Sequence, residues 1–297
     1  MRSGTAYIPC NLCKYVVVVV CMLTVANVAS ADTIRGINMN FVTIGNAGNA
    51  ADTATGYGAV GYNYQIGKCE ITNAQWDTFT AAAGIPTGND GGYGHGSTYS
   101  GANLPAQNIS WYEAAQFCNY LTSGNKYMGA YVFSGGSFMT INRPAAQATY
   151  GRVFFMPTEN EWYKAAYYKP DGSGYSLYAN GTNTAPIAGV QSNYHATVLP
   201  WNVGSGIQEQ NGTYDMMGDV WEWCETLRGV NLRVLRGGAY YNPDPGAFIS
   251  TCTYGAGTPN VDTDPGVGFR VASNIIPEPC TLIFLGLGAA ILRKRRK

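Results

Sequence analysis

The hydrophobic pattern of the first half of the chain predicts short elements separated by loops. Residues 64–66 alternate apolar and polar side chains, as a half-buried strand does. Trp76, Phe79 and Ala83 then stand at helical spacing, and Gly84 is a suitable C-terminal stop. Residues 84–103 consist mostly of Gly, Ser, Asn, Asp and Tyr. This composition predicts a long surface loop.

Two further helices are predicted from capping boxes. Ser110 is followed three residues later by Glu113, and Thr158 is followed by Glu161. Each box precedes one apolar face, which comprises Trp111, Ala114, Ala115 and Cys118 in the first helix and Trp162, Ala165 and Ala166 in the second. A strand is predicted at residues 152–156. Glu159 and Glu161 permit an acid–base role, but capping and the helix dipole also explain acids in a first turn.

Two short apolar segments near the C-terminus each contain an arginine beside a glycine. Residues 233–238 (RVLRGG) and 268–271 (GFRV) read as strands, and residues 239–266 between them have the composition of a loop. We expect Arg236 and Arg270 to bind buried carboxylates or loop carbonyls, since a guanidinium group binds such acceptors through two parallel hydrogen bonds.

The chain is organised around residues 211–225, NGTYDMMGDVWEWCE. Trp221 and Trp223 are expected in the core, so Glu222 between them requires a partner. Asp215 and Glu222 flank the turn at Gly218, and their carboxylates are ligands that Ca²⁺ prefers. The alternative is structural: Glu222 accepts backbone N–H bonds and Asp215 caps a turn.

Composition indicates a compact, loop-rich protein of one or two domains. The 297 residues include 38 glycines, 13% aromatic residues and only 12% charged residues, which is not the composition of a disordered chain. The net charge is zero, but residues 32–292 alone carry 11 basic and 18 acidic residues, a net charge of −7. An acidic body of this kind is a poor partner for nucleic acid.

The two ends read as targeting segments around a single body. Residues 1–31 combine Lys14, an apolar run and the small residues before Asp32, as an export signal does. Residues 276–297 contain Pro277-Glu278-Pro279, an uncharged stretch and the basic end RKRRK, which predicts a transient membrane tether. We therefore expect residues 32–275 to fold as an exported domain at the cell surface or in the extracellular matrix.

The cysteines and histidines do not predict a zinc site. Cys69, Cys118, Cys224 and Cys252 lie in the body, none in a CxxC pair, and the chain has only two histidines. Four cysteines allow three pairings, and the spacing does not choose among them. A nucleophile elbow, a P-loop and a dinucleotide-binding fingerprint are all missing from the sequence.

Six blocks in order carry a family resemblance: YQIGKCEITNAQW, NISWYEAAQFCNYL, FMPTENEWYKAAYY, NGTYDMMGDVWEWCE, RVLRGGAY and GFRVA. The chain resembles the formylglycine-generating enzyme (sulfatase-modifying factor) family over residues 33–273. The resemblance implies a single α+β domain, distantly like C-type lectins, with few short helices and strands and much irregular loop. The tail resembles a PEP-CTERM sorting signal, whose processing partner is an exosortase.

The resemblance also implies ligands and a disulfide. One calcium site would use the side chains of Asp215 and Glu222 and the carbonyls of Gly218 and Val220. A second would use Asn193 and Tyr194, with His195 near the place where the family has aspartate. The family brings the segment after the tryptophan pair close to the loop after RGG, which implies a Cys224–Cys252 disulfide. Cys69 and Cys118 would form the other pair.

The family's chemistry is the part that this sequence lacks. Active members hold Cu(I) with two cysteines in the loop after RGG-Ser and oxidise a substrate cysteine to formylglycine. Here Ala239 stands at the serine position, and Asn242 and Ala247 stand at the cysteine positions. Since thiolates are what select Cu(I), copper and catalytic residues are not expected.

Two hypotheses about function follow from the resemblance. The first is a secreted, surface-associated, calcium-stabilised binding or structural module, with a groove near residues 239–260. Its ligand would be an extracellular polysaccharide or another exported protein. The alternative is a metal-dependent oxidase of the same family that acts on exported proteins with a different metal arrangement, using Cys252 and Cys224.

Overall fold

The computed structural model describes residues 30–88, 99–195, 199–250, 254–256 and 266–275. The export signal apart from its last two residues, the tail, Cys252 and most of the loop 251–265 lie outside the described residues. Ser30 and Ala31 are paired with Phe41 and Asn40, so cleavage after Ala31 would remove two residues from the first strand. Among the described helices, none has the length and apolar character needed to cross a membrane.

Two sheets form the centre of the molecule. The five-stranded sheet has the order β1-β2-β3-β11-β6 and is antiparallel throughout. Its strands are β1 (Ser30–Ile34), β2 (Ile37–Ile44), β3 (Tyr64–Gly67), β11 (Ala272–Asn274) and β6 (Phe154–Phe155). The four-stranded sheet has the order β10-β7-β8-β9. Its strands are β10 (Val267–Gly268), β7 (Trp221–Leu227), β8 (Arg233–Arg236) and β9 (Tyr254–Ala256), and only the β10–β7 pairing is parallel.

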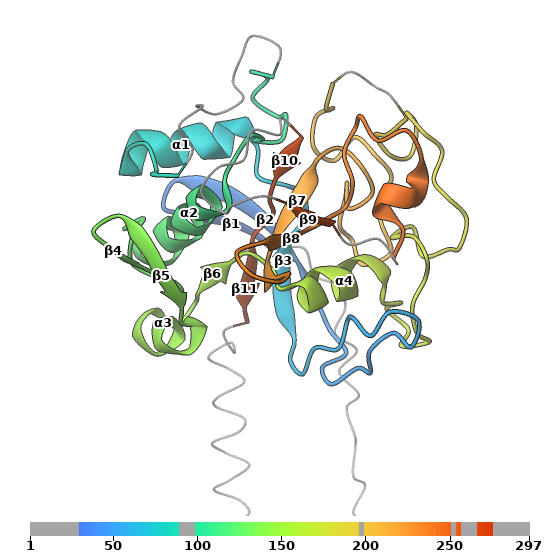
Figure 1. Cartoon of the computed structure of the whole chain (residues 1–297), viewed down its shortest axis with the longest axis horizontal. Coiled ribbons are helices and arrows are strands. Elements are labelled where there is room, and N and C mark those ends of the chain that lie inside the picture. The colour runs from blue at the N-terminus through green and yellow to red at the C-terminus, as the bar shows by residue number, and fades with distance from the viewer. Residues whose placement is uncertain (1–29, 89–98, 196–198, 251–253, 257–265, 276–297) are drawn as a thin grey trace, which may run out of the picture.

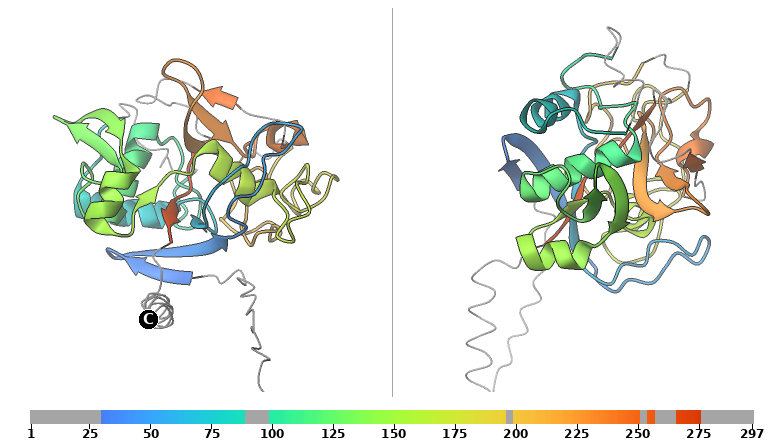
Figure 2. Two further views of the ribbon diagram at one scale, coloured as in Figure 1. Left: turned by 90° about the horizontal axis from the view of Figure 1, so that it is seen from below. Right: turned by 60° about the vertical axis from the view of Figure 1, so that its left-hand side comes forward.

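Helices and loops surround these sheets on different sides. The helices are α1 (Asn73–Ala83), α2 (Trp111–Ser123), α3 (Arg143–Tyr150) and α4 (Glu159–Tyr167), with a 3₁₀ turn at Pro245–Phe248. A separate hairpin joins β4 (Tyr131–Ser134) to β5 (Ser137–Ile141). In Figure 1, α1 and α2 lie together on one side, and the long loops between α4 and β7 lie on the other. Figure 2 shows the β1–β2 hairpin on the side of the molecule away from β9.

The two predicted capping boxes begin helices at the expected positions. Ser110 and Thr158 are the N-caps of α2 and α4, and a further capping box at Thr72 begins α1. Gly84 and Gly124 end α1 and α2. The helix predictions are therefore confirmed. The capping residues and the apolar faces both specify the same helices.

The prediction of one strand over residues 268–271 is only partly right. Gly268 ends β10 and Ala272 begins β11, so the chain passes from one sheet to the other between them. Arg270 lies at this crossing with a fully buried side chain. The apolar pattern predicted burial correctly, but it did not reveal that the segment changes sheets.

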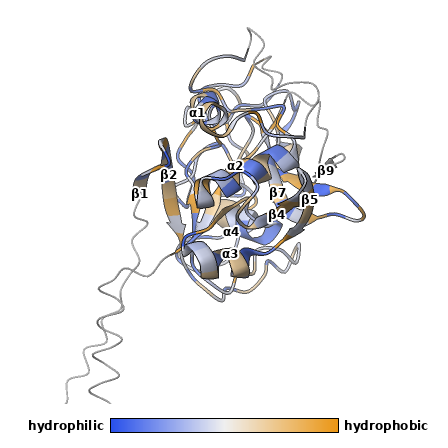
Figure 3. Cartoon of the chain, turned by 90° about the vertical axis from the view of Figure 1, so that its left-hand side faces the viewer, coloured by the Kyte–Doolittle hydropathy of each residue, from blue (hydrophilic) through white to orange (hydrophobic). Residues whose placement is uncertain are grey.

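The core is built mainly from aromatic side chains. Trp76, Phe79, Phe117 and Phe269 form one cluster, in which neighbouring ring centroids lie 5.2–6.0 Å apart. The burial pattern of β2 shows how one strand face supplies this core: its apolar residues are inside and its asparagines are exposed. Figure 3 shows the apolar colouring along β2. The predicted α+β domain with few regular elements is confirmed.

A buried ion pair connects α4 to β8. Arg236 donates to Glu159 Oε1 through Nε (3.0 Å) and Nη2 (2.6 Å), and Nη1 donates to the carbonyl of Ser250 (3.1 Å). Both side chains are buried. Glu159 is thus paired rather than available for acid–base chemistry, and Glu161 likewise completes the α4 capping box and binds Arg143.

Breaking this pair tests its structural role. Arg236→Met should destabilise the protein by about 3–5 kcal/mol, because it leaves Glu159 as an uncompensated buried charge. The double variant Arg236→Met/Glu159→Met should recover most of that loss, since no buried charge remains. Urea unfolding of both variants measures the difference. A single variant as stable as the wild type would show that Glu159 does not depend on Arg236.

Candidate metal centre

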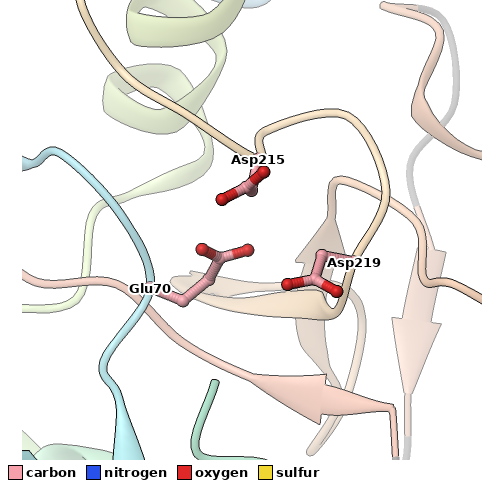
Figure 4. Close-up of side chains that lie close together, drawn as sticks. All are labelled: Glu70, Asp215 and Asp219. Atoms are coloured by element: carbon pink, nitrogen blue, oxygen red, sulfur yellow. The ribbon is translucent and has the colours of Figure 1, made fainter. Parts of the chain in front are cut away.

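Three carboxylates from distant parts of the chain meet in the interior. Glu70 follows β3, and Asp215 and Asp219 lie in the loop that leads into β7. All three side chains are buried, and one oxygen atom of each lies within 4.8 Å of the others. Figure 4 shows Glu70 pointing between the two aspartates. A cluster of three buried acids requires positive charge or protons nearby.

The loop that carries the two aspartates has an unusual backbone. Asp215, Gly218 and Asp219 all have positive φ angles, of 60°, 90° and 62°. A Cβ atom at Gly218 would lie 2.3 Å from the carbonyl oxygen of Asn193, so only glycine fits there. The Gly218 N–H donates to the carbonyl of Gly237 (2.8 Å), which ties the loop to the end of β8. These constraints fix the direction of both aspartate side chains.

A second loop covers the cluster and donates hydrogen bonds to it. Asp215 accepts from the Gly204 N–H (2.5 Å) and from Trp201 Nε1 (3.2 Å). Asp219 Oδ1 accepts from the Trp201 N–H (2.9 Å) and from Asn193 Nδ2 (2.8 Å). Asn193, Trp201 and Gly204 are therefore held in place by the carboxylates beneath them.

Several oxygen atoms of the cluster have no hydrogen-bond donor among the described residues. Both oxygens of Glu70 and Oδ2 of Asp219 are buried, and no group in the described part of the chain donates to them. Among the described residues, Arg270 forms a long ion pair with Glu70, with 4.0 Å between its Nη2 and Glu70 Oε2. Leaving a buried polar atom without a donor costs about 1–3 kcal/mol, and more when it is charged. These atoms are the ones that a bound cation would satisfy.

Glu222 belongs to a different interaction. Arg270 donates to its two oxygens through Nη2 (2.5 Å) and Nε (2.6 Å), and Trp162 Nε1 donates to Oε2 (2.7 Å). Arg270 also donates to the carbonyls of Gly67 (3.0 Å) and Tyr214 (2.9 Å). Glu222, expected as a metal ligand with Asp215, is thus bound by a guanidinium and an indole.

The electrostatics of the cluster favour a cation. Burial and repulsion by Asp215 raise the pKa of Glu70 well above its usual value, and the same causes raise the pKa of Asp219. Burial also raises the pKa of Asp215. These shifts disfavour ionisation of the three acids, and a divalent cation among them would favour it. The donors are oxygens alone, which suits Ca²⁺ and does not suit Cu(I).

The two predicted calcium sites are neighbours in the fold. Asn193 forms a bridge with Gly218, and its amide donates to Asp219. Tyr194 points away, since its hydroxyl donates to the carbonyl of Pro186 (2.7 Å). Val220 is buried and continues the Gly218 loop into β7. The structure therefore gathers Asp215, Gly218 and Asn193 at one place, and adds Glu70 and Asp219 to them.

The tryptophans on either side of Glu222 are both buried. Trp223 is fully buried and donates through Nε1 to the carbonyl of Ile109 (2.7 Å), while Trp221 is 7% exposed. The Trp223 hydrogen bond joins β7 to the segment just before α2.

Three cysteines lie in the described part of the chain. Cys69, Cys118 and Cys224 form no disulfide with one another, so the expected Cys69–Cys118 pair is wrong. Cys118 faces the core from α2, whereas Cys69 lies beside Gly204 near the acidic cluster. The Cys224–Cys252 disulfide stays a prediction, because Cys252 lies outside the described residues.

Comparison with known proteins assigns the family. The model of the sulfatase-modifying factor enzyme 1-like domain matches residues 39–275. The chain therefore belongs to the family of sulfatase-modifying factor enzyme 1-like domains.

Individual relatives are distant. A curated relative, the chaperone protein LppX of Paenibacillus barcinonensis, is 24% identical over 224 residues, 63% of this chain and 73% of the relative. Variable protein 1 of Treponema denticola has a similar structure, with a TM-score of 0.61 at 22% identity over 84% of this chain and 100% of that one. PvdO from Pseudomonas aeruginosa gives 0.55 at 15% identity over 84% and 98%. At these identities the solved structures show a shared fold.

Calcium should stabilise the folded protein. Ca²⁺ in excess over chelator should raise the thermal midpoint, because a ligand bound only by the native state adds stability of about 2.7 kcal/mol at 100 times its Kd. Glu70→Gln and Asp219→Asn should each remove the shift, while Asp171→Asn, at an exposed site, should retain it. Identical midpoints with Ca²⁺ and with chelator in the wild type would exclude calcium from this cluster.

A buried glutamate beside the cluster predicts the pH dependence of the calcium-free protein. Burial raises the pKa of Glu209 to about 8 from an ordinary value of 4.5. Its contribution to stability is complete below pH 4.5 and is lost as the pH rises through 8. In chelator, the wild type should therefore lose about 2–4 kcal/mol relative to Glu209→Gln between pH 5 and 8. Parallel stability profiles for the two proteins would contradict this assignment.

Proposed function

We propose that this protein is an exported binding module of the sulfatase-modifying factor family that lacks the family's copper chemistry. A buried cation, most consistent with Ca²⁺, would hold its surface loops in a fixed arrangement. The binding surface would consist of those loops and of the segment after β8.

This proposal rests on the contacts of Asn242 and Ala247, which stand where active members of the family have their copper-binding cysteines. Asn242 closes a tight turn: its Oδ1 accepts from the Ala239 N–H (2.6 Å), and its own N–H donates to the Ala239 carbonyl (2.9 Å). Its carbonyl accepts from the His195 N–H (2.8 Å). The side chain that stands in place of a thiolate thus maintains the turn itself.

The side chain at the other cysteine position, Ala247, packs against Gly238. Ala247 lies so close to Gly238 that a Cβ atom at Gly238 would be 3.1 Å from the Ala247 methyl group. Cys224, the thiol considered for an alternative site, is fully buried, and burial raises its pKa well above the usual value. A thiol that resists ionisation is a poor metal ligand. These features support a binding role over an oxidase.

The loops above the acidic cluster offer apolar surface for a partner. Ile187 is 60% exposed, Val190 is 65% exposed and Leu199 is 43% exposed. The Leu199 carbonyl accepts from Asn193 Nδ2 (3.2 Å), the same amide that donates to Asp219. Asn193 therefore connects the acidic cluster directly to the exposed loop at Leu199. This connection supports a role for the cluster in ordering that surface.

Export, surface attachment and the ligand belong to the same proposal. The export signal and the tail would place the domain at the cell surface or in the extracellular matrix, with an exosortase-type enzyme processing the tail. The ligand would be an extracellular polysaccharide or another exported protein. Binding of the purified domain to a glycan array, with Ca²⁺ and with chelator, tests the first of these.

The absence of oxidase activity is directly testable. Copper-loaded protein should convert none of the cysteine in a sulfatase-type CxPxR peptide to formylglycine, because a two-thiolate Cu(I) site needs ligands that residues 242 and 247 do not supply. Mass spectrometry of the peptide measures the conversion, with metal-free protein as the control. Turnover above that control would restore the oxidase alternative.

A further inference from the structure

A second concave site lies on the side of the molecule where the described chain ends. A cavity of about 490 Å³ opens between α3, β6 and the end of β11. Its apolar walls are Tyr62, Pro144, Val153, Phe155 and Ile275. Pockets of this size are typical of ligand or peptide sites. It is separate from the acidic cluster, none of whose carboxylates lines it.

A largely buried charge network connects the walls of this cavity. Arg143 stacks on Phe155, with 3.5 Å from its guanidinium carbon to the ring centroid. The same guanidinium donates to Glu161 (2.9 Å) and Glu225 (3.0 Å). The Tyr62 hydroxyl donates to Glu161 Oε1 (2.7 Å), while 50% of the Tyr62 residue surface remains exposed. Tyr62 is thus fixed at its hydroxyl and presents an open aromatic ring.

The chain itself supplies a segment that fits these walls. Ile275 both lines the cavity and is the last described residue, and Ile276-Pro277-Glu278-Pro279 follows it directly. Two residues span at most about 7 Å, so Pro277 cannot lie far from the cavity. Prolines in extended segments dock on aromatic-lined grooves because little conformational entropy is lost. Attachment raises the local concentration of such a segment to the order of mM.

Charge complementarity supports the same occupant. α3 begins at Arg143 beside the cavity, and its first turn contains no acidic residue. A carboxylate is stabilised near a helix N-terminus. Glu278 is the only charged residue between Ile275 and Leu292, so it is the group available to occupy that position.

We propose that this cavity is the docking site of the chain's own Pro277-Glu278-Pro279 segment. Docking would hold the first residues of the tail against the folded domain and fix where the apolar stretch that follows leaves it. This inference rests on the cavity and the adjoining sequence, and it does not depend on the proposed function of the loops.

Disulfide trapping in the full-length chain tests the docking. Gln147 lines the cavity, whereas its exposed neighbour Ala148 does not. Gln147→Cys should cross-link to the native Cys280 under mild oxidation at least tenfold faster than Ala148→Cys, with Glu278 kept in both variants. Replacing Pro277 and Pro279 by glycine should reduce the faster rate about tenfold. Peptide mapping identifies the bond formed.

The outcomes separate clearly. The glycine substitutions lie outside the described domain, so a reduced rate cannot be attributed to unfolding of the cavity if thermal midpoints are unchanged. Equal cross-linking rates at positions 147 and 148 would overturn the proposal. A rate at position 147 that the glycine substitutions do not change would also overturn it. Such a result would leave the proposed function untouched, because calcium binding and copper chemistry are measured at other residues.

Discussion

The structure depends on how one guanidinium is shared among buried acids. Arg270 lies where the chain crosses from β10 to β11. Its shortest hydrogen bonds go to the two oxygens of Glu222. Its remaining donors bind carbonyls before α1 and before β7. One side chain therefore joins the two sheets to the central loop. Because its charge is committed to Glu222, it neutralises Glu70 only weakly, at 4.0 Å.

Two acids that Arg270 does not bind, Asp215 and Asp219, accept hydrogen bonds from the loop that covers the cluster. Glu70, Asp215 and Asp219 lie together without a strongly bonded cation among the described residues. A cation there would neutralise them and, through Trp201, Asn193 and Gly204, order the segment that covers them. Much of this half of the molecule is irregular loop, which has little regular backbone pairing to stabilise it. An ion bound only by the folded state would stabilise such loops in one arrangement.

The sequence predicted the parts of this arrangement that are encoded locally. Capping boxes located the helices, because their hydrogen bonds lie within four residues. Asp215 was identified from its own turn. Glu70 was not predicted, although an acid between Cys69 and Ile71 requires a partner just as Glu222 does. Asp219 was not predicted because the family resemblance implies the carbonyls of Gly218 and Val220 as ligands on either side of it.

Long-range contacts account for the rest. Nothing in the local pattern indicates that Glu70 reaches a loop some 145 residues later, or that Arg270 selects Glu222 rather than Glu70. The β1–β2 hairpin and α3 were not predicted either, although residues 37–44 carry an alternating strand pattern. The family resemblance placed Asn193 and Asp215 in separate sites, whereas the fold brings their loops into contact through Gly218.

The central claim concerns the position of one ion. A crystal of the protein grown with Ca²⁺ and measured at a wavelength where calcium scatters anomalously would locate it directly. We expect an anomalous peak in contact with Glu70, Asp215 and Asp219, with Arg270 still bound to Glu222. A peak coordinated by Glu222 in place of Glu70 and Asp219, or no peak in the cluster at saturating Ca²⁺, would contradict it.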